Sequence, residues 1–162
     1  MEERWKKAGR FLVFFFAIFF GLSALISWMD LSALEGYLAA FSGGVLGLPV
    51  SGNIVSVNGY PFAITNECTG LVSAAVLCAV VFSLRKPDFK TKTVLFLIGA
   101  LVLFLLNIPR VMLVLYSAQI AGAEAAEVVH VATWFSTTLL ILGLWIWTTR
   151  LVGKIRDFSE LL

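Results

Sequence analysis

The sequence has few charges, two cysteines and a single histidine. Only 14% of its 162 residues are charged, whereas 60% are hydrophobic, and the mean hydropathy is +0.95. An average soluble domain carries about a quarter charged residues, and a soluble core of this size has no room for so much apolar surface. The composition therefore excludes a soluble enzyme, a disordered chain and a nucleic-acid-binding protein with a mainly basic surface. It predicts an integral membrane protein with no nucleic-acid partner.

The two cysteines are not placed to form a disulfide. Cys68 and Cys78 lie ten residues apart in one apolar run, which on a helix is about 15 Å of axial rise and too far for an S–S bond. We therefore predict two free thiols. The sequence has no metal-ligand cluster, phosphate-binding loop or cofactor motif, so we predict no metal and no cofactor.

Long apolar runs define the predicted spans. The first, residues 11–29, has 19 residues without a charge and follows four basic residues. A cleaved signal peptide also fits such a start, but the run is longer than a typical signal sequence and favours a spanning anchor. The other predicted spans are residues 68–84, 93–120 and 130–149.

The basic residues predict the orientation of these spans. Of the 12 Lys and Arg residues, 11 fall in the segments 4–10, 85–92 and 150–156, and none falls in 30–67 or 121–129. By the positive-inside rule, both termini are cytoplasmic in a multi-pass protein of the plasma membrane. We expect an all-α integral membrane protein of about four transmembrane helices, forming a single domain over residues 1–162. The remaining cation, Arg110, lies inside an apolar run.

The outer segment 30–67 is predicted to have a structure of its own. Ser-Ala-Leu-Glu at 32–35 matches a capping box that opens a short outer helix. The glycines at 43, 44 and 47 are expected to end it.

A β-hairpin is predicted before the second span. Asn58-Gly59 lies between β-forming residues, which is a strong hairpin signal. A two-residue turn pairs Val57 with Tyr60 and places an apolar face against the membrane or the helix bundle. Pro61 makes the second strand an edge strand.

Three chemically active side chains are predicted at one membrane level. Counted from the nearest cytoplasmic charge, Cys68 lies 17 residues along its span, Arg110 18 and His130 20, which is a rise of about 25–30 Å. The hydrocarbon core is about 30 Å thick. All three residues therefore reach the outer edge of the bilayer, on three different spans.

Each of these residues alone has a common structural role. A cysteine is often a small buried hydrophobe, an arginine near a helix end snorkels to the interface, and a single histidine often sits at the interface. Together they supply a nucleophile, an anion stabiliser and a proton shuttle, which covalent acyl transfer requires. We therefore predict an outward-facing catalytic group of Cys68, Arg110 and His130.

Neighbouring polar residues are predicted to support this group. Glu67 carries a like charge that disfavours the adjacent thiolate, so a cation such as Arg110 or protonated His130 is needed to offset it. Asn107 lies on the helical face of Arg110. Glu127 precedes His130 by three residues and is either the group that orients its ring or a solvated outer-loop carboxylate.

These motifs together resemble the exosortase/archaeosortase family. They are Asn-Glu-Cys-Thr-Gly at 66–70, Asn-Ile-Pro-Arg at 107–110 and the lone His130. The resemblance covers roughly residues 45–145 and is to a compact, core-only member. It implies a cysteine transpeptidase in which Cys68 is the nucleophile, Arg110 stabilises the anion or thiolate, and His130 is the general acid and base.

The resemblance also implies the partners. The substrates are secreted proteins with a C-terminal sorting signal, made of a short motif, one transmembrane helix and a basic tail. The acceptor is a lipid, and the product is a lipid-anchored surface protein. Two alternatives stay open: a membrane cysteine protease that hydrolyses the same signals, and a non-enzymatic structural or transporter subunit in which Arg110 pairs with Glu127 or Glu67.

Overall fold

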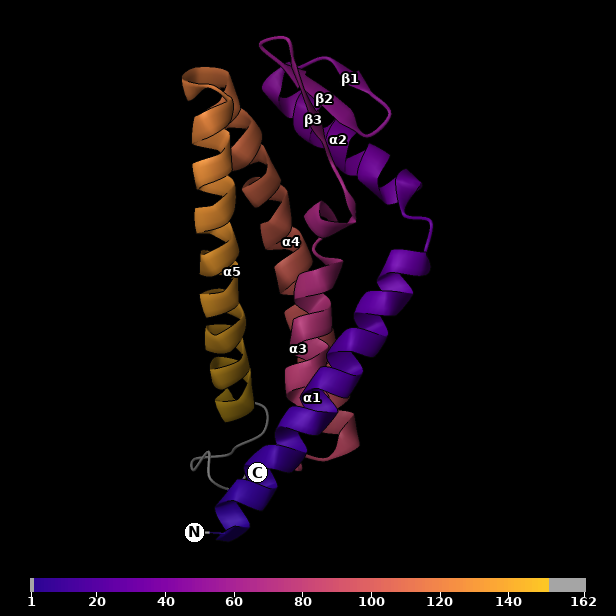
Figure 1. The fold of residues 1–162 in the computed structure, drawn as a ribbon, viewed down its shortest axis with the longest axis vertical. Coiled ribbons are helices and arrows are strands. Elements are labelled where there is room, and N and C mark those ends of the chain that lie inside the picture. The colour runs from indigo at the N-terminus through magenta and orange to yellow at the C-terminus, as the bar shows by residue number, and fades with distance from the viewer. Residues whose placement is uncertain (1, 152–162) are drawn as a thin grey trace.

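The chain is mostly helical, with a small sheet near one end (Figure 1). The computed structural model describes residues 2–151, and the predicted cytoplasmic charges Lys154 and Arg156 lie outside the described residues. The helices are α1 (Glu2–Trp28), α2 (Ser32–Leu46), α3 (Leu71–Ser83), α4 (Phe89–Ala121) and α5 (Ala123–Leu151), with the 3₁₀ turn η1 (Asn66–Thr69) before α3.

The structure supports three long membrane helices and does not confirm a count of four. Among the described residues, the helices long and apolar enough to cross a bilayer are Trp5–Trp28, Phe89–Ala121 and Ala123–Trp147. Helix α3 has 13 residues and rises only about 20 Å, less than the hydrocarbon thickness of about 30 Å. The predicted second span is shorter than expected because η1 and Gly70, with φ 82°, interrupt its start.

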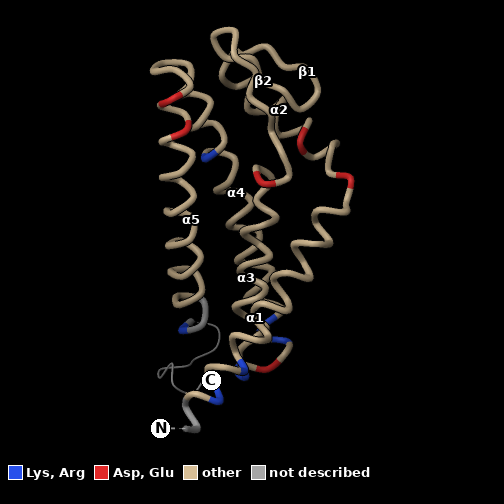
Figure 2. The backbone as a smooth tube through the Cα atoms, viewed as in Figure 1, with Lys and Arg blue, Asp and Glu red and all other residues tan. Residues whose placement is uncertain are grey.

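Charged side chains separate along the long axis of the molecule (Figure 2). Lys and Arg gather where α1 begins and where α3 meets α4, and most Asp and Glu lie at the end that carries the sheet. One cation breaks the pattern, because Arg110 lies on α4 in the half of the molecule nearer the sheet.

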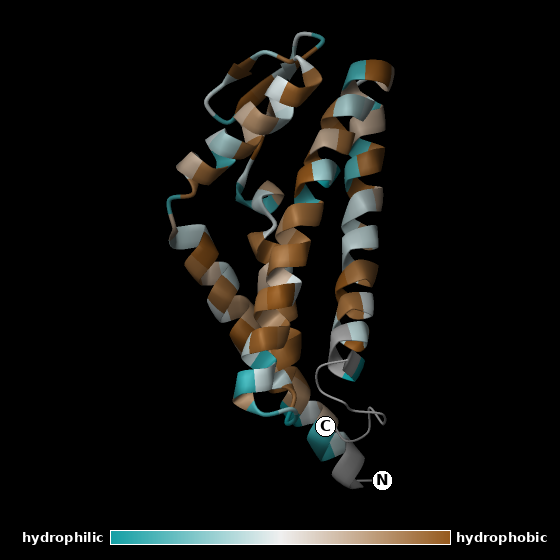
Figure 3. Ribbon diagram, turned by 180° about the vertical axis from the view of Figure 1, so that it is seen from behind, coloured by the Kyte–Doolittle hydropathy of each residue, from teal (hydrophilic) through white to brown (hydrophobic). Residues whose placement is uncertain are grey.

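The long helices carry apolar residues on their outer faces (Figure 3). Several large side chains are exposed: Phe14, Phe20, Leu97, Leu101 and Leu139. So much exposed apolar surface is typical of a face that contacts lipid or a partner. The arrangement therefore fits an all-α membrane protein.

Helix α2 begins and ends differently from the prediction. Its N-cap residue is Leu31, with no side-chain cap hydrogen bond, so the predicted capping box is wrong. Instead, the Asp30 carboxylate accepts the backbone N–H of Ser32 at 3.0 Å. Hydrogen bonding from the Ser32 side chain, and then from this N–H, lowers the pKa of Asp30. The glycines at 43 and 44 lie inside the helix, and Gly47 ends it in the left-handed region at φ 68°.

A three-stranded antiparallel sheet follows α2. Its strands are β1 (Val50–Ser51), β2 (Ile54–Val57) and β3 (Tyr60–Ala63), in the order β1-β2-β3. Val57 lies opposite Tyr60 across the turn, and Asn58 has φ 52°. Strand β3 is an edge strand, as Pro61 requires, and β1 was not predicted.

The sheet packs on the helices rather than on lipid. Val55 and Val57 are fully buried and share a core with Leu38 of α2 and Leu115 of α4. At the tip of the hairpin, the Asn58 side-chain amide donates to the carbonyl of Gln119 at 3.0 Å. These contacts fix the sheet against the end of α4, so that the chain leaving β3 runs to η1 beside α4 and α5.

A second core fills the opposite half of the bundle. It joins α3, α4 and α5 through Leu77, Val81, Leu95, Leu103, Ile141 and Leu144. Gly99 allows this packing because a Cβ there would lie 2.4 Å from a methyl group of Leu77. The two cores leave the Arg110 region between them.

Candidate active site

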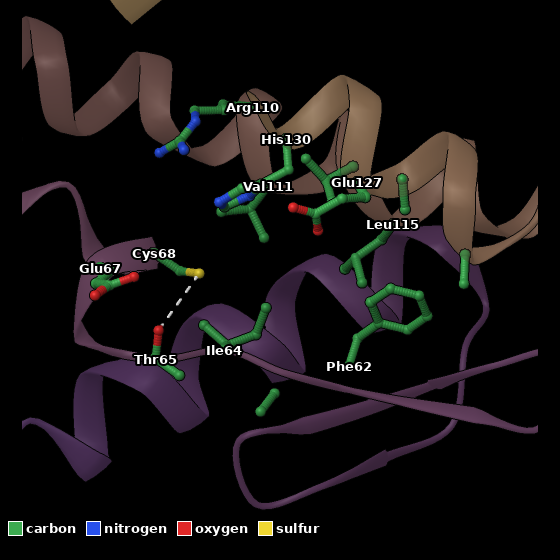
Figure 4. A pocket seen from close by; sticks show the side chains of 14 residues that line it. Phe62, Ile64, Thr65, Glu67, Cys68, Arg110, Val111, Leu115, Glu127 and His130 are labelled. Atoms are coloured by element: carbon green, nitrogen blue, oxygen red, sulfur yellow. Dashed lines mark hydrogen bonds between the residues drawn. The ribbon is translucent and has the colours of Figure 1, made fainter. Parts of the chain in front are cut away.

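A cavity of about 250 Å³ lies between the last strand of the sheet and helices α4 and α5 (Figure 4). Its walls come from β3, the segment that follows it, η1, the second half of α4 and the first two turns of α5. Apolar side chains make up much of the lining, and Cys68, Arg110 and His130 all contribute to it. The structure thus brings the three predicted residues together around one space.

Cys68 lies in η1, not at the start of a membrane helix as predicted. Its thiol is free and half-buried. The sulfur is 3.9 Å from the hydroxyl oxygen of Thr65, and the Cys68 amide donates to the carbonyl of Thr65 at 2.8 Å. The tight turn therefore holds the sulfur toward the cavity rather than along a helix axis.

Arg110 reaches the same cavity from α4. Its Nη1 donates to Asn107 Oδ1 at 3.3 Å, and its Nε donates to Thr133 Oγ1 on α5, also at 3.3 Å. Arg110 is half-buried and lines the same cavity as Cys68. Both hydrogen-bond partners are neutral.

The neutral partners of Arg110 bear on the structural-subunit alternative. That alternative requires an ion pair with Glu127 or Glu67. Among the side chains that the structure describes, no carboxylate pairs with Arg110. Both glutamates are exposed at the cavity rim, and Figure 4 shows Glu67 directed away from the Cys68 sulfur.

Asn107 connects the cysteine turn to the arginine. Its Nδ2 donates to the backbone carbonyl of Cys68, while its Oδ1 accepts from Arg110. Asn107 is buried and packs against Gly70, where an added Cβ would lie 3.3 Å from the Asn107 side chain. A glycine with φ 82° is therefore needed at this position, because it allows both the turn and the close approach.

His130 lies on α5, seven residues after the helix begins at Ala123, so it does not open the span as predicted. Its ring is half-buried and faces the cavity between Arg110 and Glu127 (Figure 4). Glu127 lies one turn earlier on α5, not in a loop. No hydrogen bond joins the described Glu127 carboxylate to the His130 ring, so the predicted orientation of the ring by Glu127 is not seen.

Two threonines of the site were missed in the sequence. Thr65 lies beside the sulfur, and Thr133 accepts from Arg110 while donating to the carbonyl of His130 at 2.9 Å. Each is three residues from a predicted site residue, so a search for hydroxyls at one-turn spacing finds both.

The whole arrangement can be compared with known proteins. A model of the transmembrane exosortase family matches residues 4–147, which include the entire cavity. The chain belongs to the transmembrane exosortase family. Exosortases are generally cysteine-type processing enzymes, so membership indicates a membrane protein that takes part in sorting-signal processing. No curated protein and no solved structure matches the chain.

The cavity of this exosortase offers a thiol, an imidazole and a guanidinium to a bound molecule. Within the described part of the chain, no group of three or more His, Cys, Asp or Glu side chains is placed to hold a metal ion. The chemistry that these three side chains support is nucleophilic attack by sulfur with proton transfer by histidine.

Proposed function

We propose that this protein is a membrane-embedded cysteine transpeptidase that cleaves C-terminal sorting signals and transfers the cleaved protein to a lipid. The observation that carries the proposal is the shared cavity, where Cys68, Arg110 and His130 meet from three separate elements. A nucleophile, an anion stabiliser and a proton shuttle around one space are the minimum set for acyl transfer.

The proposed orientation follows from the separation of charges. With the Lys- and Arg-rich end in the cytoplasm, the sheet and the cavity lie at the outer face of the plasma membrane. A sorting signal carries its cleavage motif just outside its own transmembrane helix. That motif then reaches the membrane level of Cys68, while its basic tail stays inside.

The first half of the proposed reaction forms a thioester. The Cys68 thiolate attacks the scissile carbonyl, and Arg110 stabilises the negative charge that develops on the oxygen. The C–N bond breaks as protonated His130 gives its proton to the leaving amine. The substrate's membrane helix leaves with that amine, and the upstream protein remains on the sulfur.

The second half releases the protein. His130, now neutral, removes a proton from an incoming lipid amine or hydroxyl, which attacks the thioester carbonyl. The C–S bond breaks, the lipid conjugate forms and the thiolate is restored. In this scheme Asn107 and Thr133 position the guanidinium without contacting the reacting atoms.

The test is a reconstituted reaction with a synthetic sorting signal. The substrate comes from a protein of the same genome that ends in a motif, a span and a basic tail. The purified protein in lipid vesicles is expected to produce a fragment whose mass is that of the upstream peptide acid plus a lipid minus one water. A fragment with the mass of the free peptide acid identifies a protease instead, and cleavage that persists in Cys68→Ala rules out the thioester mechanism.

A further inference from the structure

A second cavity, of about 360 Å³, lies on the other side of Arg110. It is set between α4 and α5, with Ser73 of α3 at its edge, and Asn107 and Thr133 also line it. Arg110 thus lines both cavities, and its guanidinium bonds to Asn107 and Thr133, which line the second one. The proposed reaction does not use this second space.

The second cavity is elongated and lies within the membrane helices. Along α4 its lining extends from Leu103 to Leu113, a rise of about 15 Å. Leu106, Leu113 and Leu140 line it and are 44%, 49% and 38% exposed, so the cavity is open at its side. Because these residues lie in spans, that side faces the hydrocarbon of the bilayer.

The volume of the second cavity excludes one obvious occupant. A helix with its side chains, about 10 Å wide and with a rise of about 1.5 Å per residue, fills roughly 120 Å³ per residue. A cavity of about 360 Å³ therefore holds less than one turn, and the transmembrane helix of a substrate does not fit. A single hydrocarbon chain is narrow enough to enter the cavity, and its apolar surface suits the leucine side chains that line it.

Toward its upper end the second cavity carries a positive charge, that of Arg110, which no described carboxylate pairs with. A guanidinium has five N–H donors, and Arg110 uses one on Asn107 and one on Thr133, both neutral. An ionisable residue inside a span normally has a partner or a function. The remaining donors suit the oxygens of a phosphate, which arginine binds as a planar fork.

We propose that the cavity between α4 and α5 binds one hydrocarbon chain of a phospholipid, with the lipid phosphate held by Arg110. The inference rests on the proposed function in one respect: this lipid is the acceptor of the second half-reaction. Because Arg110 borders both cavities, a headgroup bound to it lies beside the space that Cys68 faces.

The binding test uses a phosphatidylethanolamine that carries a photoreactive diazirine in one acyl chain. It is added to vesicles that contain the Cys68→Ala protein, so that binding is measured without turnover. Labelled peptides are expected from the lining segments of α4 and α5. Leu140→Trp fills the cavity and should lower labelling about tenfold, whereas Leu139→Trp, on the neighbouring lipid-exposed residue, should not. Ser136→Trp is a second filling variant should Leu140→Trp fail to reach the membrane.

A second arm tests the phosphate. A diacylglycerol with the same photoreactive chain lacks the phosphate and should label about tenfold less, the ratio expected for one charge-assisted contact. Arg110→Gln should remove that preference. Equal labelling by the two probes in the Arg110 protein contradicts the proposed headgroup contact.

The outcomes separate this inference from the proposed function. Equal labelling of the Leu139→Trp and Leu140→Trp proteins overturns the lipid site, whether or not the enzyme cleaves its substrate. Cavity labelling without any thioester on Cys68 overturns the transpeptidase and leaves the lipid site standing. In the enzyme with Cys68 intact, Leu140→Trp should lower lipid transfer about tenfold relative to thioester formation. An equal loss of both overturns the acceptor assignment.

Discussion

Helix α4 carries two cations that are buried or half-buried, Lys92 in its first turn and Arg110 in its second half, and the two make different contacts. Lys92 is buried at the Lys- and Arg-rich end, where its ammonium donates to the carbonyl of Leu84, the C-cap residue of α3. Arg110 is half-buried near the sheet, donates hydrogen bonds to two neutral side chains among the described residues and borders two cavities. Lys92 closes a helix end, whereas Arg110 keeps donors available for a ligand.

The packing around the two cations differs in the same way. Near Lys92, leucine and valine side chains of α3, α4 and α5 form a continuous helix–helix core. Near Arg110, the chain uses a sheet, a 3₁₀ turn and α2 to build the core, and it leaves two cavities. The comparison indicates that one end of the bundle is packed for stability, whereas the other contains the cavities in which we propose the chemistry.

The largest expected effect separates the two cysteines. Cys68→Ala should abolish processing, by more than about a thousandfold, because no other group replaces a covalent nucleophile. Cys78→Ala, which alters a half-buried thiol inside α3, should leave processing nearly unchanged. The measurement is substrate cleavage in cells at equal membrane abundance. A comparable loss of substrate cleavage in both variants would contradict the proposed difference between the two ends of the bundle.

The next effect separates the two cations. Arg110→Lys should insert normally yet lower turnover by about 10²–10³-fold, the usual cost of removing an oxyanion donor, since a lysine ammonium lacks the planar fork. Lys92→Met should instead lower the free energy of unfolding by about 1–3 kcal/mol, because the carbonyl of Leu84 loses its donor. Its turnover per folded molecule should change little.

To separate an effect on catalysis from an effect on folding, turnover and stability are compared for each cation variant. Turnover is measured in vesicles and thermal unfolding in detergent, for both variants and the wild type. Near-normal turnover by Arg110→Lys assigns Arg110 a snorkelling role, because lysine snorkels equally well.

A smaller effect is expected from the threonine that positions Arg110. Thr133→Val removes the acceptor of Nε and should lower kcat about tenfold, the equivalent of one hydrogen bond to a charged group. Thr133→Ser should restore it. Thr138 makes the same kind of bond to its own helix, to the carbonyl of Trp134, so Thr138→Val is the matched control. Equal losses in the two valine variants indicate a general helix effect.

The smallest effect concerns pH at the basic end. The Asp88 carboxylate accepts the N–H and O–H of Thr91 at the start of α4, and these bonds lower the pKa of Asp88. A lowered folded-state pKa contributes stability above the unfolded value of about 4, and this stability is lost as the pH falls through the folded value. The Tm advantage of wild type over Asp88→Asn should therefore shrink between pH 6 and pH 3. A Tm advantage of wild type that does not change with pH would contradict the stabilising role of Asp88 at the start of α4.

Local chemistry explains which parts of the fold were predictable. The turn at Asn58-Gly59 follows from residues that accept positive φ, and the long helices follow from apolar runs bounded by charge. The short α3 did not follow, because residues 68–70 read as the start of the apolar run until the 3₁₀ geometry of Asn66–Thr69 is known. Strand β1 has two residues, which are too few to show the alternation of apolar and polar residues that predicts a strand.

The shared cavity could be predicted from depth in the membrane, because residues at the same depth on neighbouring spans can meet. Cys68, Arg110 and His130 were placed together by counting residues along separate spans, and the structure lines one cavity with them. Thr133 was not found, because its role depends on how α5 is rotated against α4. The cavity between α4 and α5 depends on the same rotation, which the sequence pattern leaves open.

The most direct test of the central claim is the mass of the protein during a reaction without an acceptor. With a synthetic sorting signal in detergent free of lipid amines, the account predicts an adduct equal to the upstream peptide, located on Cys68 and released by hydroxylamine. Arg110→Lys should form the adduct slowly and Cys68→Ala not at all. Substrate consumed without any adduct on Cys68, or an adduct on another residue, would contradict the account.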